Sequence, residues 1–175
     1  ALSNIDAGMK RLIDLGVKVI NMSFGTAESA LRAADALPHL EVVRYALARG
    51  VLLVAASGNS GLEERYYPAA HDGVIAVGSV DDDLAPSSFS TRGEHVALCA
   101  PGRGVWTCAI SGLTQVSGTS FAAPFVAAAC ALRHSSYSAR ASSAAFSSSP
   151  ASKTALSAAC CVRSARKATM LDWAS

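Results

Sequence analysis

The feature that most constrains the fold is an alternation of helical patterns with short apolar runs, which extends from residue 3 to about residue 133. A first helix is predicted to begin at Ser3, with Ile5, Met9, Leu12 and Ile13 on its apolar face. Helices that alternate with buried strands are typical of an α/β fold. The pattern therefore predicts three layers, with a mainly parallel sheet flanked by helices.

Several apolar runs have the length and the β-branched content of strands. They are residues 17–22, 51–56, 74–80, 96–99 and 105–109. A helical pattern separates the first two runs and includes Leu31, Leu37, Leu40, Val43 and Leu47. These two runs and the pattern between them predict a right-handed βαβ unit.

The charge balance and the apolar runs exclude two classes of partner. The 15 Lys and Arg residues nearly balance the 13 Asp and Glu residues, so the net charge is only +2, too low for a surface that neutralises phosphates. The longest apolar run, residues 121–132, contains Pro124 and is shorter than the roughly 20 residues that a membrane span needs. We expect neither nucleic acid nor a membrane as a partner.

Composition divides the chain in two. All 13 glycines lie at or before Gly118, whereas residues 135–175 are rich in Ser and Ala and lack a clear amphipathic period. The last predicted helix covers residues 120 to about 133. We therefore expect one domain over residues 1–134. We expect residues 135–175 to be a tail that is poorly ordered or encoded in a shifted reading frame.

The five cysteines are an odd number and contain no C-x-x-C pair, so they predict neither a zinc site nor a complete disulfide framework. Cys99 and Cys108 flank a Pro-Gly turn and have the spacing for a bridge. Free cysteine is the commoner state of a buried residue of this type. The bridge is therefore the less favoured alternative, and metal-binding residues are not predicted.

Ser120 is the first candidate for chemistry. It lies in the segment from Gly118 to Ala127, at the predicted start of a helix. Backbone amides without partners and the positive end of the helix dipole stabilise negative charge there, as a nucleophile that attacks a carbonyl group requires. The alternative is that the Ser120 hydroxyl only caps the helix.

Asn59 is the second candidate. It follows the run at residues 51–56 within the turn Ser57-Gly58-Asn59-Ser60-Gly61, so we expect its side chain at the carboxyl edge of the sheet, where ligand sites of α/β proteins gather. A carboxamide at this edge can donate a hydrogen bond to an oxyanion. The alternative is an ordinary turn asparagine.

Several short motifs together resemble the subtilisin-like serine proteases (subtilases, peptidase S8) from Asn4 to about Leu132. They include Val19 to Gly25, Val54 to Asn59, Tyr67 to Ala69, Val74 to Gly78, Cys99 to Gly102, and Gly118 to Pro124. The order of the motifs and their spacing match the family. The resemblance implies a subtilisin-like fold, truncated at its N-terminus, and a serine endopeptidase.

The resemblance also implies roles for individual residues. Ser120 would be the nucleophile and Asn59 the oxyanion donor, while Ser23, Phe24, Gly25, Ala56, Ser57 and Gly58 would line the site of an extended peptide substrate. The family requires no cofactor, although calcium is a structural ion in many members. Members commonly act outside the cell, so an extracellular location is expected, while the oligomeric state stays open.

The remaining members of a catalytic triad are not recognised. The family order along the chain is Asp, His, Ser, yet none of His39, His71, His95 and His134 begins a His-Gly-Thr-His block. We expect these histidines on the surface or in loops, and Asp6 and Asp14 on a helix surface. The acid and base are therefore expected upstream of Ala1, and the isolated chain is expected to be inactive.

Two candidate cation sites follow from the sequence and the resemblance. Asp81, Asp82 and Asp83 are adjacent and lack the alternating spacing of a calcium loop, so a solvated turn is the favoured interpretation. Carbonyl groups of residues 69–74 are a second candidate, by resemblance alone.

Two other functions remain open at this stage. One is a peptide-binding protein of the same fold that has lost turnover. The other is an unrelated α/β domain that binds a small molecule and in which Ser120 only caps a helix.

Overall fold

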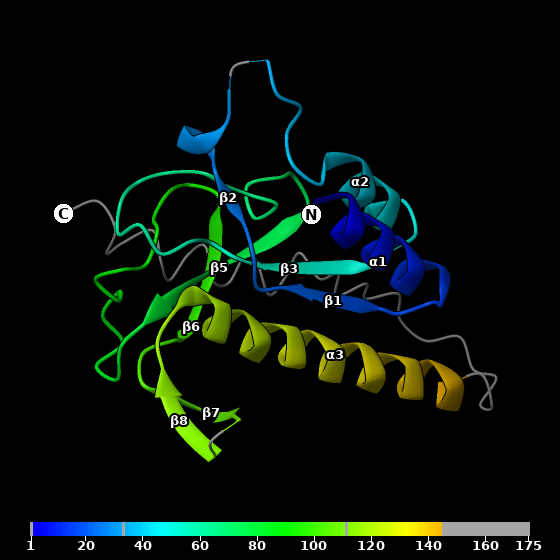
Figure 1. Ribbon diagram of the computed structural model, residues 1–175. Helices are drawn as coiled ribbons and strands as arrows, with labels where there is room; N and C mark the ends of the chain where they lie inside the picture. Colours follow the sequence, from blue (N-terminus) through cyan, green and yellow to red (C-terminus); the bar gives the residue numbers. More distant parts are fainter. Residues whose placement is uncertain (1, 33, 111, 145–175) are drawn as a thin grey trace. The chain divides into compact units, whose positions relative to one another are not determined.

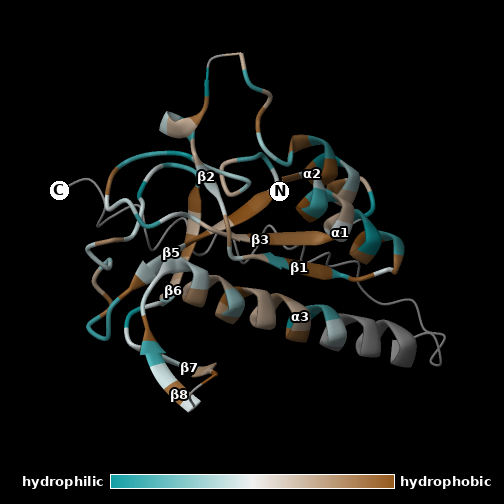
Figure 2. Ribbon diagram, viewed as in Figure 1, coloured by the Kyte–Doolittle hydropathy of each residue, from teal (hydrophilic) through white to brown (hydrophobic). Residues whose placement is uncertain are grey.

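The computed structural model describes residues 2–32, 34–110 and 112–144. Its centre is a sheet of four parallel strands, β1 (Val19–Met22), β3 (Leu52–Ala56), β5 (Val74–Val80) and β6 (Val96–Pro101), in the order β1-β3-β5-β6. These central strands consist largely of hydrophobic residues, drawn in brown in Figure 2. The parallel sheet and the βαβ unit from β1 to β3 confirm the predicted α/β fold.

Strand β3 shows how the sheet separates two cores. Leu53 and Ala55 face one side and belong to a cluster with residues of helices α1 (Leu2–Asp14) and α2 (Leu40–Leu47). Val54 and Ala56 face the other side, because successive side chains of a strand alternate, and they pack with the start of helix α3 (Thr119–Ala144). The sheet therefore lies between two helical layers, as predicted (Figure 1).

Helix α1 differs in detail from the prediction. It begins at Leu2, so Ser3 lies within the helix and does not precede it as a cap. Met9 and Ile13 are buried, but the expected apolar-face residue Leu12 is 44% exposed. The buried stripe of α1 is thus narrower than the sequence period suggests.

The prediction of helical structure from Leu31 to Leu37 is wrong. A short 3-10 helix (Glu28–Ala30) precedes this segment, and turns, bends and irregular backbone occupy the described residues up to α2. The Asp35 carboxylate accepts a hydrogen bond from the Arg32 amide at 3.0 Å, and such local side-chain bonds compete with helix formation. Pro38 further disfavours helical geometry at the residue before it.

Two small antiparallel sheets lie outside the central one. Strand β2 (Thr26–Ala27) pairs with β4 (Tyr66–Tyr67), and β7 (Val105–Ala109) pairs with β8 (Gly112–Val116). Residues 105–109 were predicted correctly as a strand, but β2, β4 and β8 were not predicted. Strands β2 and β4 have only two residues each, and so short a strand carries almost no sequence period.

Helix α3 continues through the predicted domain boundary. The chain divides into two compact units between Ala131 and Leu132, and α3 extends to Ala144, beyond its predicted end near Arg133. Residues 145–175 lie outside the described residues. The tail and its reading frame therefore remain predictions.

Cys99 and Cys108 are free thiols, as favoured from the sequence, so the alternative Cys99–Cys108 bridge is not formed. Burial raises the pKa of the Cys99 thiol, against a weaker opposing effect of a hydrogen bond with the Gly78 backbone. Cys160 and Cys161 lie outside the described residues. None of the described helices is long and apolar enough to span a bilayer.

Candidate active site

Ser120 occupies the first turn of α3 and contacts the end of strand β1. The Ser23 hydroxyl donates to the Ser120 carbonyl at 2.8 Å, and the Ser120 hydroxyl donates to the Ser23 carbonyl at 3.2 Å. Asn21 donates in turn to the Ser23 hydroxyl at 2.9 Å. The two bonds between Ser23 and Ser120 join residues 97 positions apart in the sequence and hold the start of the helix against the sheet.

Asn59 follows strand β3, and hydrogen bonds with Thr119, the residue before Ser120, fix its side chain. The Thr119 backbone amide donates to Asn59 Oδ1 at 2.9 Å, and the Thr119 hydroxyl lies 3.0 Å from the same oxygen. The hydroxyl also accepts a hydrogen bond from the Gly58 amide at 3.3 Å. With Oδ1 occupied, the amide orientation leaves Nδ2 as a donor, and none of the hydrogen bonds among the described residues uses it.

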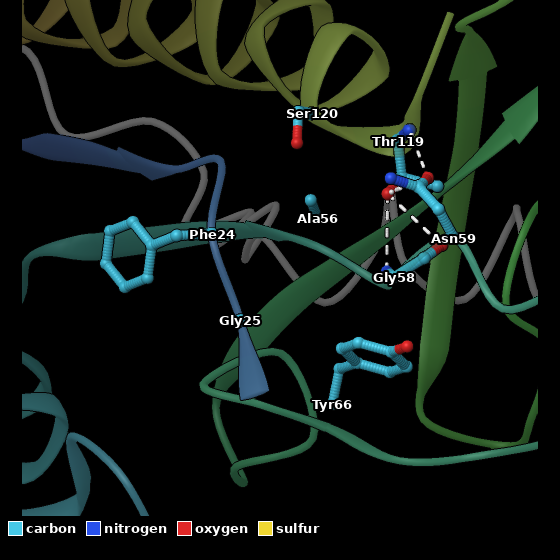
Figure 3. Close-up of a pocket in the computed structure, with 8 residues that line it drawn as sticks. All are labelled: Phe24, Gly25, Ala56, Gly58, Asn59, Tyr66, Thr119 and Ser120. Carbon is cyan, nitrogen blue, oxygen red and sulfur yellow. Dashed lines mark hydrogen bonds between the residues drawn. The ribbon is translucent and has the colours of Figure 1, made fainter. Parts of the chain in front are cut away.

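These residues border a cavity of about 310 Å³. Its lining consists of Phe24, Gly25, Ala56, Gly58, Asn59, Tyr66, Thr119 and Ser120 (Figure 3). Ser120 and Asn59 thus border one cavity, the arrangement that the family resemblance implies for them. The cavity opens at the carboxyl ends of β1 and β3, the edge at which ligand sites of α/β folds gather.

Four of the six predicted substrate-binding residues line this cavity: Phe24, Gly25, Ala56 and Gly58. The Phe24 ring itself points away from Ser120 (Figure 3). Ser23 holds Ser120 but does not line the cavity. Ser57, which follows β3, does not line the cavity either: it is fully buried, and its hydroxyl donates to the Thr91 carbonyl at 3.2 Å.

Tyr66 and Thr119 also line the cavity but were not predicted from the sequence. Thr119 adjoins Ser120, and its position at the helix start was a sufficient signal for a residue that interacts with the catalytic candidates. Tyr66 gave no comparable signal, because its place at the cavity depends on the long-range pairing of β4 with β2.

None of the described residues that line the cavity carries a formal charge at neutral pH, so their contribution to its electrostatics comes from dipoles. Ser120 lies in the first turn of α3, where backbone N–H groups lack intrahelical partners and the helix dipole is positive. The Asn59 Nδ2 donor adds to this field. The cavity therefore favours negative charge that develops on an oxygen beside Ser120.

The histidines lie in turns or bends or on the surface, as expected, but His39 and His71 are buried within their turn or bend. The His39 side chain is buried, and its Nδ1 lies 2.5 Å from the Asp6 carboxylate. His71 is also buried, with Nε2 2.7 Å from the Pro38 carbonyl, and His95 is partly buried, whereas His134 is exposed. The His39 ring packs against the Phe24 ring, with 5.2 Å between the ring centroids. This contact helps to fix Phe24, which lines the cavity.

The three consecutive aspartates form a turn after β5, as favoured from the sequence. The Asp81 carboxylate accepts bonds from Arg103 Nε at 2.7 Å and from the Ser87 hydroxyl, and these bonds hold the pKa of Asp81 below its usual value. Asp83 accepts a bond from the Ala85 amide at 3.0 Å. With two of the three carboxylates engaged in this way, the run does not fit a calcium loop.

Comparison with known proteins agrees with this geometry. Residues 2–170 match the Subtilase family. Subtilisin DY from Bacillus licheniformis is 40% identical over 142 residues, which cover 77% of this chain and 49% of that protein. Thermitase from Thermoactinomyces vulgaris is 39% identical over 71% of this chain and 43% of its own length.

Solved structures give the same result. The prenylagaramide maturation protease PagA matches with a TM-score of 0.65 and 32% identity, over 73% of this chain and 47% of that chain. The self-cleaved protease domain of PatA matches with a TM-score of 0.64 and 34% identity, over 72% and 48%. The chain belongs to the subtilase family, and it spans about half the length of the curated relatives it matches.

Proposed function

We propose that this chain carries the nucleophile and the oxyanion donor of a subtilase serine endopeptidase. The observation that carries the proposal is the fixed carboxamide of Asn59. Two donors of Thr119 occupy its Oδ1, which leaves Nδ2 as the donor beside Ser120 at the same cavity. Membership of a family of serine proteases supports the same function.

In the proposed reaction, Ser120 Oγ attacks the carbonyl carbon of a peptide bond and passes its proton to a base. The carbonyl oxygen becomes an oxyanion that accepts hydrogen bonds from Asn59 Nδ2 and from the Ser120 amide. The base then protonates the leaving amine, the C–N bond breaks, and an ester of Ser120 remains. Water, deprotonated by the same base, hydrolyses the ester and frees Ser120.

The substrate is proposed to bind as an extended peptide. Ser23 to Gly25 follow β1, and Ala56 to Gly58 end or follow β3, so both segments offer backbone groups beside the cavity. An extended peptide uses such groups for affinity and the cavity for side-chain selectivity. Before it can react, the Ser120 hydroxyl must leave its bond to the Ser23 carbonyl.

The base and its carboxylate partner are proposed to come from sequence before Ala1, in the family order Asp, His, Ser. His39 does not fill this role, because its ring is buried and bound to Asp6. We therefore expect the isolated chain of 175 residues to hydrolyse peptides negligibly. The proposal requires no cofactor. Calcium as a structural ion and an extracellular location remain predictions from the family.

Hydrolysis of a peptide substrate by the full-length protein tests the proposal. We expect Ser120→Ala to abolish turnover and Asn59→Ala to lower kcat by about 10² to 10³, the range known for loss of one such donor in a subtilisin. Ser29→Ala, an exposed serine outside the cavity, is the matched control and should retain full activity. Equal turnover by Ser120→Ala and the parent protein would refute the proposal, and peptide binding without turnover would favour the non-catalytic alternative.

A further inference from the structure

Tyr66 lies in the cavity at the end opposite Ser120 (Figure 3). Its backbone is fixed by pairing of β4 with β2, in which Tyr66 is opposite Ala27 and Tyr67 is opposite Thr26. Side chains alternate along a strand, and Tyr67 is buried, with its hydroxyl donating to Glu28 at 3.3 Å. Tyr66 is therefore directed away from the protein interior and into the cavity.

The Tyr66 ring crosses the cavity from wall to wall. A Cβ added to Gly25 would lie 3.5 Å from Tyr66 Cδ1, and a Cβ added to Gly58 would lie 2.5 Å from Tyr66 Cδ2. The Cδ1 and Cδ2 atoms are on opposite edges of the ring, so each edge faces a different wall. Gly58 also has a φ of +111°, a conformation that suits glycine and lets its backbone approach the ring.

The closed end leaves limited space for a substrate. The cavity of about 310 Å³ is at the lower end of the range for ligand pockets, and it must hold the reacting peptide group as well as a side chain. Among the described residues, those that line the cavity carry no formal charge at neutral pH that could pair with a charged substrate side chain. Burial of such a side chain without a partner is costly.

We propose that Tyr66 forms the floor of the substrate pocket and selects peptides with a small, uncharged side chain, such as alanine or serine, immediately before the bond that is cleaved. This inference rests on the proposed endopeptidase function. A small side chain ends above the ring, whereas that of phenylalanine or leucine overlaps the space the ring occupies. The selectivity thus comes from the ring and not from the phenol hydroxyl.

The test measures kcat/KM of the full-length protein on peptides that differ only in the residue before the cleaved bond: Ala, Leu, Phe, Lys or Glu. We expect the parent protein to prefer Ala over Phe by at least about 10-fold, as one or a few excess methylene groups can produce. Tyr66→Ala should lower or reverse this ratio, and Tyr66→Phe should retain it. Tyr45→Ala, which removes a tyrosine of α2 outside the cavity, should leave both ratio and rate unchanged.

Equal rates for Ala and Phe in the parent protein, or an unaltered ratio in Tyr66→Ala, would overturn the inference while the endopeptidase proposal stands. If the parent protein hydrolyses none of the peptides, that proposal fails, and binding decides the role of Tyr66. In that case ligand-observed NMR should detect tighter binding of a peptide ending in Ala than of one ending in Phe, with the difference lost in Tyr66→Ala. If Tyr66→Ala does not fold, judged by circular dichroism, Tyr66→Leu replaces it in both measurements.

Discussion

The two faces of the central sheet are packed with different residues, and the difference explains how the candidate site is built. The face toward α1 and α2 is filled by larger side chains, among them Met9, Ile13, Met22, Val43 and Leu53. The face toward α3 is filled largely by alanines, with Ala122, Ala123 and Ala127 on the helix itself. Large residues bury more apolar area, whereas small ones allow a helix to approach a sheet closely.

This close approach is what brings the start of α3 to the strand ends. Thr119 reaches Gly58 and Asn59, and Ser120 reaches Ser23, all through hydrogen bonds of 2.8 to 3.3 Å. We infer that the α1 and α2 face supplies most of the cohesion of the domain, while the α3 face supplies the position of Ser120. Changes of side-chain volume on the two faces should therefore have different consequences.

Removal of volume from the α1 and α2 face should have the largest effect on stability. Leu53 is fully buried there, and Leu53→Ala is expected to lower the free energy of unfolding by about 2 to 5 kcal/mol through lost transfer energy and a cavity. Its neighbour Val54 is equally buried on the opposite face, and Val54→Ala should cost less. Urea denaturation of both variants measures the difference, and a larger loss for Val54→Ala would contradict the comparison.

Addition of volume to the α3 face should affect catalysis more than stability. Ala123 is fully buried, so Ala123→Leu overpacks the contact with the sheet at an expected cost of about 1 to 3 kcal/mol. The displaced helix start should lower kcat by about 10²-fold, the effect of a misplacement of roughly 1 Å. Ala129→Leu, at an exposed position of the same helix, is the matched control. Equal kcat values for the two variants would show that the small residues do not position Ser120.

His71 provides the smallest expected effect, a pH dependence of stability. Burial is the main cause that lowers the His71 pKa, although the bond to the Pro38 carbonyl opposes it. The unfolded chain thus binds the proton more tightly, so the stabilisation is complete above a pH of about 6.5, the ordinary value for histidine, and is lost as pH falls below it. His71→Gln should flatten the pH profile of the unfolding free energy between pH 7 and 5. An unchanged slope would contradict the assignment to His71. The pH dependence that remains in His71→Gln is expected from His95, because burial lowers the pKa of that side chain as well.

The parts of the fold that were predicted from sequence are those fixed by local pattern. Runs of β-branched residues gave β1, β3 and β5, and the motifs around Asn59 and Ser120 predicted that these residues meet. Asn59 follows the parallel strand β3 at the carboxyl edge of the sheet, and the small residues of α3 allow Ser120 at the helix start to approach that edge. The roles of Ser120 and Asn59 in catalysis remain proposals that local pattern cannot test.

The features that were missed depend on contacts between distant residues. Tyr66 enters the cavity only because β4 pairs with β2, two residues against two. The burial of His39 was missed because its Nδ1 lies 2.5 Å from the carboxylate of Asp6, 33 positions away, and no local pattern shows this contact. The continuation of α3 beyond Arg133 was missed because residues 134–144 lack an amphipathic period.

The most direct test of the central claim is to map where a fluorophosphonate probe reacts on the full-length protein, by mass spectrometry of its peptides. Our account predicts one adduct on the peptide that contains Ser120, none after Ser120→Ala, and slower labelling after Asn59→Ala. An adduct on a different serine, or labelling that persists in Ser120→Ala, would contradict the assignment of Ser120 as the nucleophile and of Asn59 as its oxyanion donor.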